Sequence, residues 1–131
     1  MKRMACVVVD DDPRIRESLQ NLFDSVLIEA AFYSSAEEFL AEHELQCARC
    51  LITDVWMPGI SGYELQEHLI RRGLDIPIIF ISAHPDNKKQ EEANAKGALA
   101  LLHKPFDGEE LLEWVFKAMP EKREGPSNRP S

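Results

Sequence analysis

Apolar and polar residues alternate along the chain in blocks that predict five strands, each followed by a helix. The apolar runs expected to form strands cover residues 4–9, 26–33, 50–53, 78–81 and 98–102. Unbroken apolar runs such as 4–9 are typical of parallel strands that are covered on both faces. The segments between these runs place apolar residues at helical spacing. We therefore expect a single α/β sheet with right-handed crossovers over residues 1–120.

Capping signals mark where several of the helices begin. The candidates are Asp12 ahead of Pro13, Ser35 with Glu38, Ser61 with Glu64, and Asp107 with Glu110. These are residues that satisfy free backbone N–H groups at a helix start. The helix expected over residues 86–96 differs, because Ala93 and Ala95 are its only apolar residues. We expect this helix to be weakly anchored.

Composition limits the possible partners and locations. The 131 residues include 15 Lys and Arg against 23 Asp and Glu, a net charge of -8. An acidic balance argues against a nucleic-acid-binding surface and against an anionic membrane surface. No apolar run approaches the roughly 20 residues of a membrane span, so we expect a cytoplasmic protein. Residues 121–131 are polar and rich in Pro, Gly and Ser, which predicts a disordered tail or a linker stub.

Three cysteines, Cys6, Cys47 and Cys50, do not form the pattern of a disulfide framework. Cys47 and Cys50 have C-x-x-C spacing, but the chain holds no second such pair. Zinc sites use four ligands, and redox pairs need a reactive thiolate. We interpret these residues as buried or incidental thiols.

Polar residues follow the apolar runs at the ends of four predicted strands. Asp10 and Asp11 follow the first, Asp54 the third, Ser82 the fourth and Lys104 the fifth. Each residue alone fits an ordinary role, as a turn or capping acid or a solvated lysine. The carboxyl ends of parallel strands meet at one edge of a sheet, where ligands bind. We therefore expect these side chains to converge there.

Three converging carboxylates repel one another unless a cation lies among them. Oxygen ligands of this kind suit Mg²⁺, which also binds phosphate groups. A carboxylate can attack phosphorus to give an aspartyl phosphate. Lys104 could offset charge on the transferred group and Ser82 could donate to one of its oxygens. The sequence thus predicts a site that accepts a phosphoryl group on Asp54.

The chain resembles the receiver domain of bacterial two-component response regulators over residues 4–119. The resemblance rests on four segments in the family's order and spacing: VVVDDDPRIR, DVWMPGISGYEL, IIFISAH and GALALLHKPF. Each segment alone is a weak signal, but the combination is specific. The resemblance implies a flavodoxin-like (βα)5 fold, a doubly wound parallel sheet with strand order 2-1-3-4-5.

The resemblance also implies a role for each matching residue around the acceptor. Asp54 corresponds to the phosphoacceptor. Asp10 and Asp11 correspond to the acidic pair that holds Mg²⁺ together with Asp54, and Asp12 lies outside this pair. Trp56 occupies the position whose backbone carbonyl binds the metal ion.

Further residues match the family's switch elements. Ser82 corresponds to a switch hydroxyl, and Lys104 to a lysine that pairs with phosphate and precedes a cis Pro105. The family usually has Tyr or Phe three residues before the lysine, where this chain has Leu101. Leucine cannot reproduce the movement of an aromatic ring. We therefore expect a signal to pass through the Ser82 loop and the helix at residues 86–96.

The function implied by the resemblance is a phosphoacceptor switch. A histidine kinase or phosphotransfer protein would donate the phosphoryl group, and the output would be transcriptional rather than catalytic turnover. A phosphatase working through an aspartyl phosphate is an alternative, but it would want an acid where Trp56 stands. A non-phosphorylated interaction module is another. The 131 residues contain no expected effector domain, so we expect either a stand-alone receiver or one cut from a longer regulator.

The last predicted helix carries more apolar residues than one buried stripe needs. They are Leu111, Leu112, Trp114, Val115, Phe116 and Met119. We expect Leu101 of the fifth strand to lie beside them. Such a surplus suggests a homodimer face formed by the last helix and the fifth strand. The alternative is that Trp114 merely covers the edge of the sheet.

Overall fold

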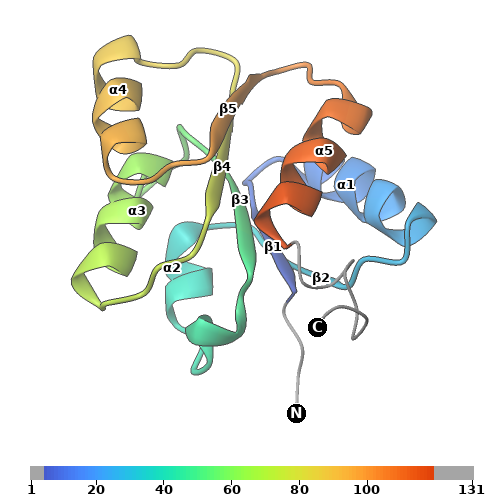
Figure 1. Cartoon of the computed structure of the whole chain (residues 1–131), viewed down its shortest axis with the longest axis horizontal. Helices are drawn as coiled ribbons and strands as arrows, with labels where there is room; N and C mark the ends of the chain where they lie inside the picture. The colour runs from blue at the N-terminus through green and yellow to red at the C-terminus, as the bar shows by residue number, and fades with distance from the viewer. Residues whose placement is uncertain (1–4, 120–131) are drawn as a thin grey trace, which may run out of the picture.

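A computed structural model describes residues 5–119, in which five strands alternate with five helices (Figure 1). The strands are β1 (Cys6–Val9), β2 (Ala30–Tyr33), β3 (Cys50–Asp54), β4 (Ile78–Ser82) and β5 (Ala100–His103). The helices are α1 (Pro13–Ser25), α2 (Ala36–Leu40), α3 (Gly62–Arg71), α4 (Asn87–Ala95) and α5 (Gly108–Ala118), and a 3-10 turn, η1, covers Leu45–Cys47. All five predicted strands are present, but the second begins at Ala30 rather than at residue 26, and the fifth covers Ala100–His103 rather than 98–102. The predicted tail at residues 121–131 lies outside the described residues. Within the described part of the chain, every helix is too short or too polar to span a bilayer.

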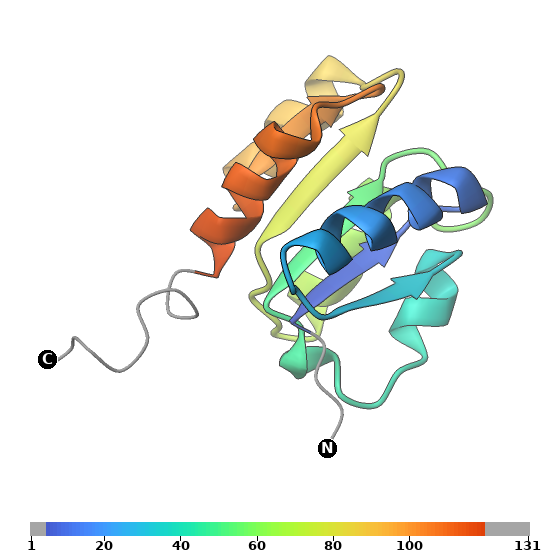
Figure 2. The same cartoon turned by 90° about the vertical axis from the view of Figure 1, so that its right-hand side faces the viewer.

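The sheet has the strand order β2-β1-β3-β4-β5, and each neighbouring pair is parallel. β1 lies between β2 and β3, and its Val8 pairs with Phe32 of β2 and with Ile52 of β3. Helices α1 and α5 cover one face, and α2, α3 and α4 cover the other (Figures 1 and 2). The predicted doubly wound, flavodoxin-like fold is confirmed.

Two apolar clusters hold the layers together, one on each face of the sheet. Alternate residues of β1 serve both, because Val7 and Val9 join the cluster under α2 and α3 while Val8 joins the one under α1 and α5. Every residue of β1, β3 and β4 is buried. Burying an aliphatic side chain of this size contributes about 1.5–3 kcal/mol. The apolar runs at 4–9 and 78–81 therefore mark strands that are buried on both faces, whereas the apolar run at 98–102 belongs to the partly buried edge strand β5.

The predicted helix starts are confirmed, although two caps differ in detail. Asp12 accepts the Arg14 N–H at the start of α1, and Ser61 and Glu64 form the expected reciprocal capping box of α3. Ser35 accepts the Glu38 N–H as predicted, but the Glu38 carboxylate accepts from the backbone and hydroxyl of Ser34 rather than from Ser35. The side chain of Asp107 accepts from Glu109 N–H at the start of α5. The caps fix where each strand-to-helix loop ends.

The cysteines lie in structural positions. Cys6 and Cys50 begin β1 and β3, where they are buried partners in register. Contact with Cys50, together with burial, raises the pKa of Cys6 well above its ordinary value. A thiol with a raised pKa forms little thiolate at neutral pH, so Cys6 is a packing residue. Cys47 lies in η1 and is partly exposed.

Leu101 does not lie beside the last helix, contrary to expectation. Along β5, Ala100 and Leu102 face the cluster under α1 and α5, whereas Leu101 packs into the cluster on the opposite face. Side chains of a strand alternate between the two faces, so a shift of one residue changes sides. Leu101 therefore cannot contribute to a surface on α5.

The attachment of α4 also differs from the expectation. The helix buries Ala93, as its apolar pattern predicts, but it also buries Gln90. Gln90 makes hydrogen bonds to Tyr63 and Asn94. The helix is anchored through polar groups instead of an apolar stripe.

Candidate functional site

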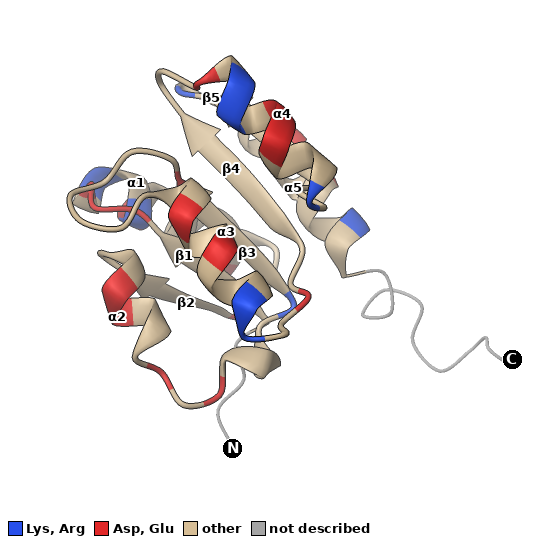
Figure 3. Cartoon of the chain, turned by 90° about the vertical axis from the view of Figure 1, so that its left-hand side faces the viewer, with Lys and Arg blue, Asp and Glu red and all other residues tan. Residues whose placement is uncertain are grey.

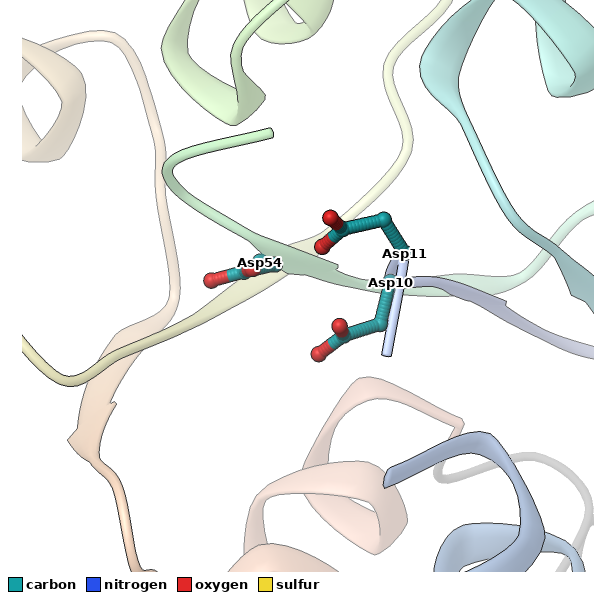
Figure 4. A group of neighbouring side chains, drawn as sticks. All are labelled: Asp10, Asp11 and Asp54. Carbon is teal, nitrogen blue, oxygen red and sulfur yellow. The ribbon is translucent and has the colours of Figure 1, made fainter. Parts of the chain in front are cut away.

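Three carboxylates meet at the carboxyl edge of the sheet. Asp54 is the last residue of β3, and Asp10 and Asp11 follow β1, the neighbouring parallel strand. One oxygen of each carboxylate lies within 4.8 Å of the others. Figure 4 shows the three side chains projecting from the two strand ends toward the same space. The structure thus brings these three acids together, as the spacing of the sequence suggested.

Lys104, which follows β5, reaches into the same cluster. Its Nζ lies 3.0 Å from Asp10 Oδ2 and 3.4 Å from Asp54 Oδ2. The backbone N–H of Lys104 donates to the carbonyl of Ser82 at 3.0 Å, which fixes the start of the loop. The peptide bond to Pro105 is cis, as the resemblance implied. A lysine ammonium is therefore held against two carboxylates of the site.

Burial and mutual repulsion dominate the electrostatics of the acids. Burial, followed by the charge of Asp10, raises the pKa of Asp54 to about 6, while Lys104 opposes this rise. Burial also raises the pKa of Asp10, against the opposing effects of the Asp12 N–H and Lys104. Burial alone would lower the pKa of Lys104, but Asp10 and Asp54 together outweigh it and raise this pKa. The site is therefore short of positive charge.

The donor set fits a hard cation. Asp10 is fully buried, and its Oδ1 accepts the Asp12 N–H at 2.9 Å. Its Oδ2 has only the ion pair with Lys104 and no aligned hydrogen-bond donor. A buried carboxylate oxygen whose one partner is a shared lysine is only partly compensated, and two further carboxylates lie beside it. Oxygen ligands with an excess of negative charge are what Mg²⁺ prefers, so Asp10, Asp11 and Asp54 fit this ion.

The loop after β1 is held in place by two side chains outside the acidic set. Asp12 caps α1 and pairs with Arg14, and its carboxylate is thereby directed away from a role in the cluster. Arg16, in the first turns of α1, donates from Nη1 to the carbonyl of Asp10 at 2.6 Å. The guanidinium also brings positive charge close to the acids. The loop geometry thus depends on α1 as well as on β1.

Two residues that the sequence did not single out shape the loop after Asp54. A β-carbon on Gly62 would lie 2.4 Å from the backbone oxygen of Asp54, so only glycine fits there. Glu37 of α2 accepts the N–H of Ile60 at 3.1 Å. The contacts of Gly62 and Glu37 come from segments that meet in the fold.

Ser82 ends β4 and Trp56 lies on the loop after β3, both beside the acids. The register of β3 and β4 pairs Asp54 with Ile81, so Ser82 follows one residue further along the edge. The Ser82 hydroxyl oxygen accepts the His84 N–H at 3.0 Å, which leaves its hydrogen available to donate. Trp56 is 45% exposed, and its indole Nε1 donates to the carbonyl of His84 at 2.8 Å. This bond between the two loops was not predicted from the sequence.

The fold and the acidic edge together define a flavodoxin-like α/β domain with a candidate cation site. A family model described as "Response regulator receiver domain" matches residues 6–116. The chain therefore belongs to the receiver domain family of response regulators.

Relatives and solved structures agree with this assignment. Nodulation protein W of Bradyrhizobium diazoefficiens is 43% identical over 111 residues, which are 85% of this chain and 49% of the relative. Transcriptional regulatory protein FixJ of Azorhizobium caulinodans is 39% identical over 82% of this chain and 51% of the relative. The structure of response regulator StyR has a TM-score of 0.82 and 38% identity, covering 94% of this chain and 64% of StyR. The structure of FixJ-N has a TM-score of 0.78 and 32% identity, covering 90% of this chain and 94% of FixJ-N.

The chain spans about half the length of the curated relatives it matches. Several of these relatives are transcriptional regulatory proteins by name. The similarity thus covers the receiver part of longer regulators.

We predict that the ionised Asp54 carboxylate lowers the free energy of unfolding when no divalent ion is present. Because its pKa is raised from 3.8 to about 6, the folded state binds this proton more tightly than the unfolded state. Stability contributed by this group is therefore present below about pH 4 and is lost as the pH rises through about 6. Without divalent ions at about pH 7.5, Asp54→Asn should raise the free energy of unfolding by about 1 kcal/mol, after allowance for solvent screening. Urea denaturation in EDTA measures this change.

With magnesium, the native protein should become more stable than Asp54→Asn. An ion that binds only the folded state stabilises that state, and the variant has lost one ligand. Asp75→Asn, at an exposed aspartate before β4, is the control and should show neither effect. Lower stability of Asp54→Asn in EDTA would contradict the account.

Proposed function

We propose that this receiver domain accepts a phosphoryl group on Asp54 and works as a signalling switch. The observation that carries this proposal is the position of Asp54, between two other carboxylates and the ammonium group of Lys104. A nucleophile, its charge-balancing lysine and a cation-binding acidic pair thus lie at one edge of the sheet. These are the parts that phosphoryl transfer needs.

The transfer requires Asp54 in its ionised form. With a pKa of about 6, most Asp54 side chains are carboxylates at neutral pH. A carboxylate oxygen forms the new bond to phosphorus while the bond from phosphorus to the donor atom breaks. The donor atom leaves with the electron pair of that bond. The raised pKa also makes the carboxylate more basic than an ordinary aspartate.

Lys104 and Ser82 are proposed to hold the transferred group. Nζ of Lys104 already lies 3.4 Å from Asp54 Oδ2, within reach of an oxygen attached to phosphorus at that position. The free hydroxyl hydrogen of Ser82 can donate to another such oxygen. The three negative oxygens of a phosphoryl group would then meet one ammonium and one hydroxyl donor.

Asp10, Asp11, Asp54 and the backbone carbonyl of Trp56 are the proposed ligands of Mg²⁺. When bound, this ion supplies the positive charge that neutralises the developing charge on the phosphoryl oxygens. Asp10 offers an oxygen whose one partner is Lys104, and Asp11 is exposed at the mouth of the site. The excess of carboxylates over cationic side chains supports this assignment.

The proposed partner is a histidine kinase or a phosphotransfer protein, in the cytoplasm. The proposed output is control of transcription, because the names of related regulators refer to transcription and their chains extend beyond the receiver. We further propose that the domain does not turn over a phosphoester substrate. The residue two positions after Asp54 is Trp56, whose indole bonds to His84 and supplies no second acid.

The second prediction tests the acceptor. Incubation with acetyl phosphate and magnesium should attach one phosphoryl group, which intact mass and peptide mapping assign to Asp54. Asp54→Asn should remain unlabelled, and withdrawal of magnesium should slow labelling at least about tenfold because uncompensated charge remains on the phosphoryl oxygens. Asp12→Asn is the matched control and should label normally, since asparagine also caps α1. Label on another residue, or steady release of phosphate in excess of the protein, would refute the switch.

We also propose that phosphorylation favours a homodimer formed through α5 and β5. Leu111, Val115 and Met119 are buried in the core, whereas Leu112 and Trp114 are only partly buried. Lys117 covers part of the Trp114 ring, with Nζ 4.6 Å from its centroid. The partly buried side chains support a contact surface on α5.

The third prediction is that phosphorylation raises the molar mass measured by light scattering. Trp114→Glu should abolish this rise, because it places a charge in the proposed contact. Ile70→Glu is the control, at a half-exposed apolar residue of α3, and should dimerise like the native protein. A monomer in both states, or equal effects of the two variants, would overturn the dimer.

A further inference from the structure

Helix α4 is attached to the domain mainly by polar contacts with α3. It buries Gln90 and Ala93, and its other residues are exposed. A single buried alanine provides little apolar stabilisation. Figure 3 shows α3 and α4 side by side, with acidic segments on both. The seam between these helices therefore depends on hydrogen bonds and ion pairs.

Three side-chain contacts close this seam. The Tyr63 hydroxyl donates to Gln90 Oε1 at 2.9 Å, and Gln66 Nε2 donates to the carbonyl of Ala93 at 3.1 Å. Lys96 forms an exposed ion pair with Glu67 beyond the end of α4. The exposed pair contributes little. The two hydrogen bonds are buried, so breaking either leaves an unsatisfied polar group.

Tyr63 connects this seam to the loop that follows Asp54. Its ring is buried and packs against Phe80 of β4, with centroids 5.1 Å apart. The ring of Trp56 meets it edge-on at 6.0 Å and 86°. Burial raises the pKa of Tyr63, so its hydroxyl remains a donor at neutral pH. One side chain therefore touches both the acceptor loop and α4.

The contacts continue from Trp56 to the acceptor edge. The Trp56 indole donates to the carbonyl of His84, and the His84 N–H donates to the hydroxyl oxygen of Ser82. Ser82, His84, Trp56, Tyr63 and Gln90 thus form an unbroken series of direct contacts. Its first member is the residue proposed to donate to a phosphoryl oxygen, and its last member holds α4.

We propose that Tyr63 is a positioning residue that couples the state of Asp54 to the attachment of α4. The proposal rests on the proposed function. When the Ser82 hydroxyl turns toward a phosphoryl oxygen, its bond from His84 changes, and the change reaches Tyr63 through the Trp56 indole. The bond from Tyr63 to Gln90 then weakens, and α4 opens more often.

Hydrogen exchange tests this coupling in the whole chain. Amide exchange over residues 87–95 is measured with magnesium alone and with magnesium plus beryllofluoride, a phosphoryl mimic. In the native protein, beryllofluoride should increase exchange in α4 at least about threefold. Tyr63→Phe keeps the ring but removes the bond to Gln90, so its α4 should exchange about tenfold faster without the mimic and should lose most of the response.

A second variant and a matched control complete the design. Trp56→Phe keeps an aromatic ring but cannot donate to His84, so it should also lose the response while α4 stays as protected as in the native protein. Tyr33→Phe alters a buried tyrosine of β2, remote from α4, and should respond like the native protein. If Tyr63→Phe does not fold, Gln90→Met provides the same test from the other side of the bond.

Labelling by acetyl phosphate distinguishes a failure of the coupling through Tyr63 from a failure of the proposed function. Tyr63→Phe, Gln90→Met and Tyr33→Phe should still label on Asp54, because none of them alters an acid, Lys104 or the residue whose carbonyl is proposed to bind Mg²⁺. Normal labelling of Tyr63→Phe, together with a native α4 response in Tyr63→Phe and in Trp56→Phe, would overturn the coupling alone. Normal labelling with no α4 response in the native protein would do the same. Failure of the native protein to label would overturn the proposed function and the coupling with it.

Discussion

The repulsion among carboxylates at one edge of the sheet is the constraint on which the rest of the site depends. Asp10 and Asp54 are buried there, and Asp11 lies beside them. Burial of like charges is unfavourable, and one lysine compensates only part of it. The folded domain therefore holds a site whose energy falls when positive charge or a proton enters. A cation is an addition that such a site can use, and the proposed phosphoryl group would bring further negative charge for that cation to offset.

The apolar burial of two interior strands offsets this unfavourable arrangement of charges. β1 and β3 are completely buried, and their parallel register sets the spacing of the two acidic strand ends. Surrounding residues then fix the loops, with Arg16 on the carbonyl of Asp10 and Gly62 against the carbonyl of Asp54. A rigid platform under a strained cluster of charges lets a small chemical change at Asp54 affect the loops around it.

Much of the fold follows from local patterns, and the differences have specific physical causes. Unbroken apolar runs and capping residues determine the strands and helix starts, and the acids at strand ends indicate the site. The burial of Gln90 could not be predicted, because its hydrogen-bond partner Tyr63 lies 27 positions away in the chain. The sequence pattern does not determine the register of β5 to within one residue, so it could not predict on which face of the sheet Leu101 packs. Leu27 takes a positive φ of 61° after α1, where glycine would be expected.

The most direct test of the central claim is the titration of the Asp54 carboxyl group by carbon NMR. Without divalent ions, the account predicts a pKa of about 6 for Asp54. Asp10→Asn should lower this value, since it removes the neighbouring charge, and magnesium should lower it in the native protein. An Asp54 pKa near the ordinary 3.8, unchanged by magnesium and by Asp10→Asn, would contradict the account.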